Sequence, residues 1–147
     1  MHRVGFEEVV LVAKDRELLD RVSQSPHDLG DENWVLFDPT HGLTEVIDLF
    51  CASLGIQPRG AARSAQVEAA LTLSLDGVGI TLLPENVVPL ELRAEHTARA
   101  GPGVFRELVA YTRGQPSALA NRYVELLLGL DLGLIRKGSL PPDAIVC

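Results

Sequence analysis

The sequence predicts an α/β fold in which helices flank a mainly parallel sheet. Residues 9–13 form a continuous apolar run rich in β-branched side chains, which is typical of a strand buried on both faces. Residues 43–54 carry apolar side chains at helical spacing, which indicates a helix with one buried face. Strand and helix patterns alternate along the 147 residues, and this alternation favours parallel strands joined by crossover helices.

The first half of the chain contains two predicted strands and one clear helix. After the strand at residues 9–13, the polar residues 14–33 predict a connection with one short helical turn. The second strand, at residues 34–37, runs into a turn-rich loop at residues 38–42. The helix that follows ends at Gly55, a typical residue just beyond a helix C-terminus. Its apolar stripe consists of Leu43, Val46, Ile47, Phe50 and Leu54.

The second half continues the alternation. Residues 61–63 predict a weak strand, after which Ser64 is expected to cap a helix that runs to about residue 75. A strong strand at residues 78–83 stops at Pro84. The remaining expected elements are an exposed strand at residues 91–98, a last strand at 108–112, a closing helix from Ser117 and a loose extension at 129–147.

Composition and charge exclude several classes of protein. Asp and Glu number 20 against 13 Lys and Arg, a formal net charge of −7, whereas a domain that grips nucleic-acid phosphates is normally basic. The two cysteines, Cys51 and Cys147, fit no disulfide framework or metal-ligand spacing. No apolar segment is long enough to span a membrane. We therefore expect a cytoplasmic protein with no metal and no cofactor.

The loop between the second strand and its helix is the first candidate site. In an open α/β sheet, ligands bind beyond the carboxyl ends of the strands, where a helix N-terminus offers free N–H groups to an anion. The Thr40 hydroxyl adds a donor, so the loop suits a small carboxylate. A purely structural role stays open, because Asp38 or Thr40 could simply cap the helix. The candidate residues of this loop are Asp38, Thr40, His41 and Gly42.

Two further groups of residues are weaker candidates for a functional site. Ser64 and Gln66 stand at a second helix start, where they could add a hydroxyl and an amide to the same cleft or serve only as a cap. Cys51 with His41 suggests a thiol hydrolase, but a cysteine in the middle of a helix is far more often a core residue. The sequence carries no dinucleotide loop, Walker A motif or nucleophile elbow, so enzyme function finds no support.

Several short motifs, taken in order, resemble one known family. Residues 64–84 (SAQVEAALTLSLDGVGITLLP) are similar to the signature of the effector-binding domain of LysR-type transcriptional regulators. In that signature a serine-led helix runs into a Gly-x-Gly turn and a strand that ends in proline. Residues 9–13 resemble the strand that leads out of the first lobe, and residues 50–58 resemble a helix end of the second lobe. Residues 106–113 resemble the returning strand, and residues 117–128 the closing helix.

The resemblance implies a periplasmic-binding-protein-like fold of type 2, in which two α/β lobes hold a small effector between them. Thr40 and its neighbours would line that cleft by position, and the nearby walls would carry Ser64, Gln66, Pro84 and Glu85. The effector would be a small organic acid that is sensed and not transformed. The implied boundaries are a partial effector-binding domain at 1–128, with the second lobe at about 14–105, crossing strands at about 7–13 and 106–113, and a closing helix at about 117–128.

Departures from the family pattern shape the remaining expectations. The winged helix-turn-helix and the front of the first lobe have no counterpart in these residues, so DNA would be reached only through another domain. The helix at residues 43–54 would lack its usual mate and is expected to self-associate or to pair with a related regulator. Two hypotheses stay open: the sensing and dimerisation part of a regulator, or a stand-alone protein that pairs with full-length regulators. The expected interface residues are Leu43, Val46, Ile47 and Phe50.

Overall fold

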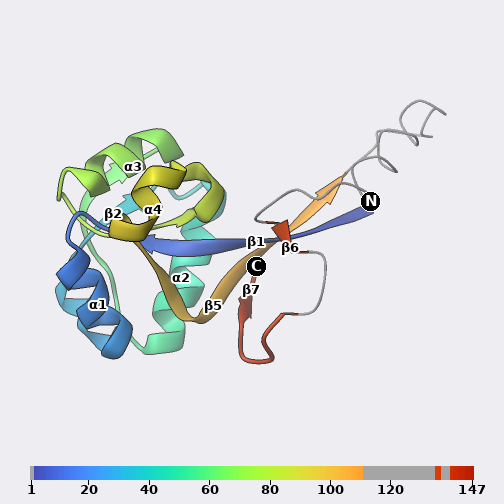
Figure 1. Ribbon diagram of the computed structural model, residues 1–147, viewed down its shortest axis with the longest axis horizontal. Coiled ribbons are helices and arrows are strands. Elements are labelled where there is room, and N and C mark those ends of the chain that lie inside the picture. Colours follow the sequence, from blue (N-terminus) through green and yellow to red (C-terminus); the bar gives the residue numbers. More distant parts are fainter. Residues whose placement is uncertain (1, 111–134, 137–139) are drawn as a thin grey trace.

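The computed structural model describes residues 2–110, 135–136 and 140–147, which form one lobe and a ribbon that extends from it (Figure 1). The predicted closing helix at residues 117–128 lies outside the described residues. The helices are α1 (Arg16–Gln24), α2 (Gly42–Leu54), α3 (Val67–Leu75) and α4 (Leu90–His96), with 3-10 turns η1 (Pro26–Asp31) and η2 (Glu85–Val87). The strands are β1 (His2–Val12), β2 (Asn33–Phe37), β3 (Arg59–Ser64), β4 (Thr81–Pro84), β5 (Thr97–Ala110), β6 (Ile135–Arg136) and β7 (Ile145–Val146).

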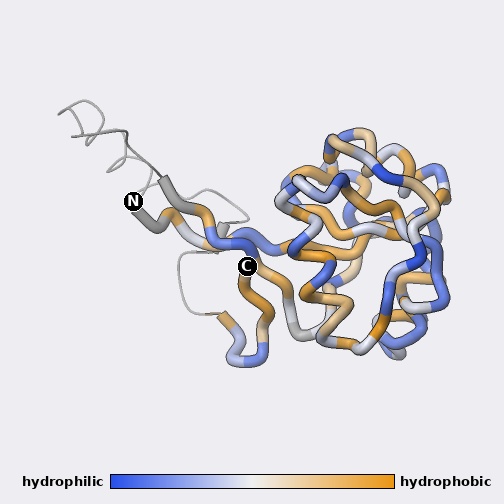
Figure 2. The backbone as a smooth tube through the Cα atoms, turned by 180° about the vertical axis from the view of Figure 1, so that it is seen from behind, coloured by the Kyte–Doolittle hydropathy of each residue, from blue (hydrophilic) through white to orange (hydrophobic). Residues whose placement is uncertain are grey.

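β1 is the central strand of the fold. Its second half pairs antiparallel with β4 on one side and with β5 on the other. Val9, Leu11 and Val12 are at most 1% exposed, which confirms the prediction of a strand buried on both faces. In Figure 2 this hydrophobic stretch enters the interior of the lobe, and the backbone becomes hydrophilic where β1 leaves it.

The α/β class is confirmed, and the sheet is mixed. β2 and β3 are parallel, and the Val35 N–H donates to the Ile80 carbonyl at 2.8 Å, which sets the approach to β4 parallel to β2. The pairings of β1 with β4 and β5 are antiparallel, so the sheet is less parallel than the sequence predicts. The reason is that β2, β3 and β4, which are joined through helices, run in one direction, whereas β1 enters the lobe in the opposite direction.

Helices cover both faces of this sheet. α1 and α2 lie on one face, and α3 and α4 lie on the other (Figure 1). Trp34 on β2 is fully buried, and its indole N–H donates to the Leu29 carbonyl of η1 at 3.0 Å. Among the described residues, every helix falls short of the length and apolarity that crossing a membrane requires.

The structure corrects two of the predicted elements. Residues 91–98, expected as an exposed strand, belong mostly to α4, whose Leu, Glu, Arg and Ala residues are good helix formers. Residues 14–33, expected as a connection with one turn, contain the nine-residue helix α1 and then η1. α1 buries Leu19 and Val22 on one face, so an amphipathic pattern was present within the polar stretch.

β1 and β5 leave the lobe together as an antiparallel ribbon (Figure 1). β5 bends where residues 100–103 loop out of the ladder, and Gly101 and Gly103 have φ angles of 57° and 124° there. β6 pairs with Phe6 and Glu7 of β1, and β7 pairs with β5. β6 and β7, within residues 129–147, therefore pair with the ribbon, where the sequence predicts a loose extension.

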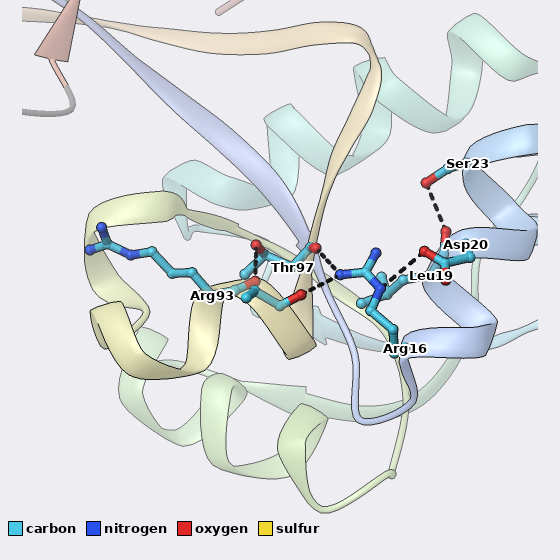
Figure 3. Close-up of polar contacts among 7 residues, drawn as sticks. Arg16, Leu19, Asp20, Ser23, Arg93 and Thr97 are labelled. Carbon is cyan, nitrogen blue, oxygen red and sulfur yellow. Dashed lines mark hydrogen bonds and ion pairs between the residues drawn. The ribbon is translucent and has the colours of Figure 1, made fainter.

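Arg16 of α1 forms hydrogen bonds with the C-terminal end of α4 (Figure 3). One guanidinium nitrogen donates to the Ala94 carbonyl at 2.7 Å and to the Thr97 carbonyl at 2.8 Å, and Nε donates to Asp20 at 3.0 Å. The last carbonyls of a helix have no partner within the helix, so a cation there satisfies them and opposes the negative end of the helix dipole.

We expect Arg16→Met to lower the free energy of unfolding by about 1–3 kcal/mol, because two hydrogen bonds from a charged donor to backbone carbonyls are lost. Arg21→Met on the same helix is the matched control. Within the described part of the chain, Arg21 is paired with the Glu32 carboxylate at the surface, and its loss is expected to cost about 0.5 kcal/mol or less. Urea unfolding followed by circular dichroism measures both, and equal losses would contradict the role given to Arg16.

Candidate functional site

The predicted site loops meet at one edge of the sheet. β2 and β3 are parallel with Phe37 opposite Ser64, so the loops that follow both strands start side by side. The Asp38 N–H donates to the Ser64 carbonyl at 3.1 Å and ties these loops together. β4 runs parallel to β2, and Pro84 and Glu85 follow at the same edge. The structure thus gathers the candidate residues at the carboxyl ends of three strands.

His41 caps α2, a role that the sequence analysis gave to Asp38 or Thr40. Its Nδ1 accepts a hydrogen bond from the Leu43 N–H at 3.0 Å, and its ring stacks on Phe37 with 4.4 Å between centroids. The Asp38 carbonyl accepts from the Thr44 hydroxyl at 2.7 Å. Thr40 takes no part in these bonds and is exposed at the tip of the loop, where its hydroxyl is available to a ligand.

The second loop is a local turn. The Ser64 hydroxyl accepts from the Gln66 N–H at 3.1 Å and donates to the Gln66 carbonyl at 2.8 Å. Ser64 therefore does not cap α3, which starts at Val67 with Gln66 at the cap position and no side-chain bond there. The exposed Gln66 side chain is the freer of the two polar groups. Pro84 is buried in the ladder opposite Val9, so of the last two candidates only Glu85 has a partly exposed side chain.

Glu7 and Arg106, which the sequence analysis did not single out, complete this edge. They lie opposite each other on β1 and β5, and Arg106 Nε donates to Glu7 Oε1 at 2.6 Å. Glu7 is 6% exposed, whereas the Arg106 side chain keeps 34% of its surface exposed. A methyl group placed on Gly42 would lie 4.0 Å from Arg106 Nη1, so the guanidinium stands beside the first residue of α2.

The positive groups of this edge are Arg106 and the start of α2, and they lie among the carboxylates of Glu7 and Glu45. The amino end of the 13-residue helix α2 carries a partial positive charge and N–H groups that have no partner within the helix. Arg106 adds a full positive charge. One side of its guanidinium is bonded to the buried Glu7 carboxylate. The exposed part of the guanidinium and the start of α2 face each other across Gly42. Among the described residues, no group of three potential metal ligands comes together.

Cys51 lies in the core and not at this edge. It is 2% exposed, and burial, followed by the nearby Asp48 carboxylate, raises the pKa of the thiol to about 12. A thiol with such a pKa is a poor nucleophile, because the thiolate is the reactive form. His41 is engaged as the helix cap, so the pair does not form the arrangement that a thiol hydrolase requires.

The predicted interface stripe on α2 faces its own lobe. Each of its side chains is at most 1% exposed, so together they form the contact of α2 with the sheet. The stripe is therefore not a free interface: helical periodicity shows that a face is apolar but not what covers it. The buried residues are Leu43, Val46, Ile47 and Phe50.

A lobe of this construction, with helices on both faces of the sheet and loops gathered at the carboxyl ends of its strands, has the periplasmic-binding-protein-like fold. The family model described as LysR substrate binding domain matches residues 1–132, so the chain belongs to that family. The family is one of regulators and is not defined by a reaction. The search of curated proteins found no match.

Solved structures agree with this fold. The effector-binding domain of QuiR in complex with shikimate is 18% identical, with a TM-score of 0.59 over 86% of this chain. HinK, a LysR family regulator from Pseudomonas aeruginosa, is 19% identical with a TM-score of 0.60 over 84% of this chain and 44% of that one. An OxyR mutant from Porphyromonas gingivalis is 18% identical with a TM-score of 0.64 over 99% of this chain and 68% of that one. The chain spans 62% of the length of the QuiR domain.

In a Cys147→Ser variant, where Cys51 is the sole thiol, we expect thiol reagents to react only as fast as the lobe opens. At about pH 8, a pKa of about 12 leaves roughly one thiolate in ten thousand. The measurement is labelling by a disulfide reagent in buffer and in urea. Rapid labelling of the folded protein would contradict the buried position and revive the hydrolase hypothesis.

Proposed function

We propose that this chain is the effector-sensing part of a LysR-type transcriptional regulator and that its effector carries a carboxylate. The observation that supports this most is the convergence of Arg106 on Gly42 at the start of α2. The effector is bound and released unchanged, and DNA is contacted through a helix-turn-helix domain outside these residues. The site of action is the cytoplasm.

A carboxylate fits the chemistry of the edge. Its oxygens accept hydrogen bonds from the exposed N–H groups of a guanidinium, and the positive end of the α2 dipole favours its charge. The Thr40 hydroxyl stands at the rim and supplies a neutral donor to a second polar group of the ligand. Shikimate, the ligand of the QuiR domain, is itself a carboxylic acid. The acidic net charge of the chain would oppose such a ligand at long range, so recognition has to come from these local donors.

Self-association is the second part of the proposal, and it uses the outer side of α2 in place of the buried stripe. Leu49 is 42% exposed there, and the neighbouring strand β3 has a strand partner only on its β2 side among the described strands. A cavity of about 230 Å³ lies between α2 and the β2–β3 pair. It is lined by Leu36, Phe37, Pro39, Thr44, Ile47, Asp48 and Arg63.

The carboxylate prediction is tested by two-dimensional NMR with shikimate, benzoate and succinate, each beside its methyl ester. We expect the acids to shift the amide resonances of Gly42 and Leu43, and the esters to bind about tenfold more weakly or not at all. Thr40→Val is expected to weaken binding by about three- to tenfold through the lost hydroxyl. The control is Thr72→Val, whose hydroxyl donates to the Glu68 carbonyl within α3.

Two results would count against the carboxylate site. If the acids and the esters shift the same resonances equally, the charge of the ligand is not recognised. If none of the acids shifts the resonances of residues 40–43 at any accessible concentration, the α2 edge does not bind a small carboxylate.

The self-association prediction is tested by sedimentation equilibrium. We expect Leu49→Glu to weaken association of the chain by about tenfold or more, because a charge would be buried without a partner. Thr72→Glu on α3 adds the same charge elsewhere and is expected to leave association unchanged. A wild-type chain that sediments as a monomer at all concentrations would contradict this part of the proposal.

A further inference from the structure

Glu7 and Arg106 form a buried ion pair across the two strands that leave the lobe, β1 and β5. Two nitrogens of the guanidinium bond to the same carboxylate oxygen, Glu7 Oε1: Nε at 2.6 Å, and Nη2. A carboxylate that is removed from water needs a charged partner, because an unpaired buried charge is costly. Arg106 is therefore held at Glu7 before any ligand arrives.

The Glu7 carboxylate occupies one edge of the guanidinium and leaves another edge open. An arginine side chain carries one N–H group on Nε and two on each Nη. Glu7 takes the N–H of Nε and one N–H of Nη2. Within the described part of the chain, the N–H groups of Nη1 and the second one of Nη2 bond to no acceptor, and 34% of the side chain is exposed.

The open edge lies beside the start of α2. A methyl group placed on Gly42 would be 4.0 Å from Nη1, the nitrogen that Glu7 does not bind. Gly42 is the first residue of α2. The contact with Glu7 and the approach to α2 thus use different nitrogens of one rigid, planar group. Because that group is planar, binding at Nε and Nη2 also fixes the direction of Nη1.

We propose that Glu7 is a positioning residue of the effector site. It holds Arg106 by Nε and Nη2, so that Nη1 and Nη2 grip the carboxylate of the effector through two parallel hydrogen bonds beside the start of α2. Glu7 itself does not touch the effector. This inference rests on the proposed function, because it names the residue that prepares Arg106 at the same site.

The position and the charge of Glu7 have opposite effects on an acidic ligand. A neutral residue in place of Glu7 removes a negative charge from the site, and by charge alone an anion would then bind more tightly. The same change releases the guanidinium, which then loses side-chain entropy when a ligand orders it. If Glu7 acts by position, the second effect prevails. We expect Glu7→Met to weaken binding of benzoate, shikimate and succinate by about three- to tenfold.

Glu7→Gln is the rescue variant. Its amide oxygen still accepts hydrogen bonds from Nε and Nη2, whereas the negative charge is gone. We expect this variant to bind the three acids at least as tightly as the wild-type chain. The NMR titrations described above measure all of these affinities in the full chain.

Glu8→Met is the matched control. Glu8 follows Glu7 on β1 and is paired with Arg99 on β5 at 3.0 Å, so the change also removes one negative charge and one ion pair between these strands. Arg99, however, lines a cavity with residues of α1 and η1, away from the start of α2. We expect the acids to bind to Glu8→Met within about twofold of wild type.

Hydrogen exchange of the Arg106 Nε–H tests the positioning role without a ligand. In wild type this N–H is bonded to a buried carboxylate, so we expect Glu7→Met to speed its exchange with water by about tenfold or more and Glu7→Gln to keep it slow. Arg106→Lys identifies the resonance by its loss. The Arg93 Nε–H, which donates to the Val88 carbonyl at 2.8 Å, is the internal reference, and its unchanged exchange shows that the lobe stays folded.

The outcomes separate this proposal from the function it rests on. If wild type binds the acids, Glu7→Met weakens binding and Glu7→Gln restores it, both stand. Binding to Glu7→Met as tight as to wild type, an equal loss in Glu8→Met, or an unchanged Arg106 Nε–H would overturn the positioning role and leave the function intact. If wild type binds none of the acids, the carboxylate function is wrong and the inference fails with it.

Discussion

The pairing of β1 with β4 and β5 is the contact on which the rest of the structure depends. The inner half of β1 is the buried centre of the lobe, and its outer half is one strand of the ribbon. A single strand thus supplies both the buried centre of the core and the ladder from which Glu7 projects. A strand buried on both faces has to bond on both edges, since an unpaired backbone group costs free energy in the interior. That requirement fixes β4 and β5 beside it.

Much of this fold could be predicted from the sequence because its strong signals are local. The apolar run at residues 9–13 and the stripe of α2 each reflect burial within one element, as do residues 80–83 of the run predicted at 78–83, where β4 starts at Thr81. The errors fall where an element has few buried side chains: α1, which was taken for a connection, buries Leu19 and Val22. α4 has no fully buried side chain and packs only Leu92 against the core, so an irregular alternation was mistaken for a strand. Ser64 preceded a helix in the sequence, but its hydroxyl was drawn into a turn with Gln66.

At the candidate site, too, local features could be predicted from the sequence and long-range contacts could not. The loops after β2 and β3 could be placed together from sequence, because parallel strands end at a common edge. Glu7 and Arg106 could not, since they are 99 positions apart and only the register of β1 against β5 brings them together. The α2 stripe was identified correctly as apolar, yet its partner was its own sheet. Periodicity describes one side of a contact, and the other side has to come from the tertiary structure.

The burial of Glu7 explains why Arg106 is suited to a sensing role. A carboxylate with 6% exposure needs a charged partner, so the guanidinium is fixed beside Gly42 whether or not a ligand is present. A fixed cation loses little side-chain entropy when a ligand binds, and part of it stays open to solvent. Held by Glu7 and partly open to solvent, Arg106 combines a preorganised charge with an exposed face that a ligand can reach.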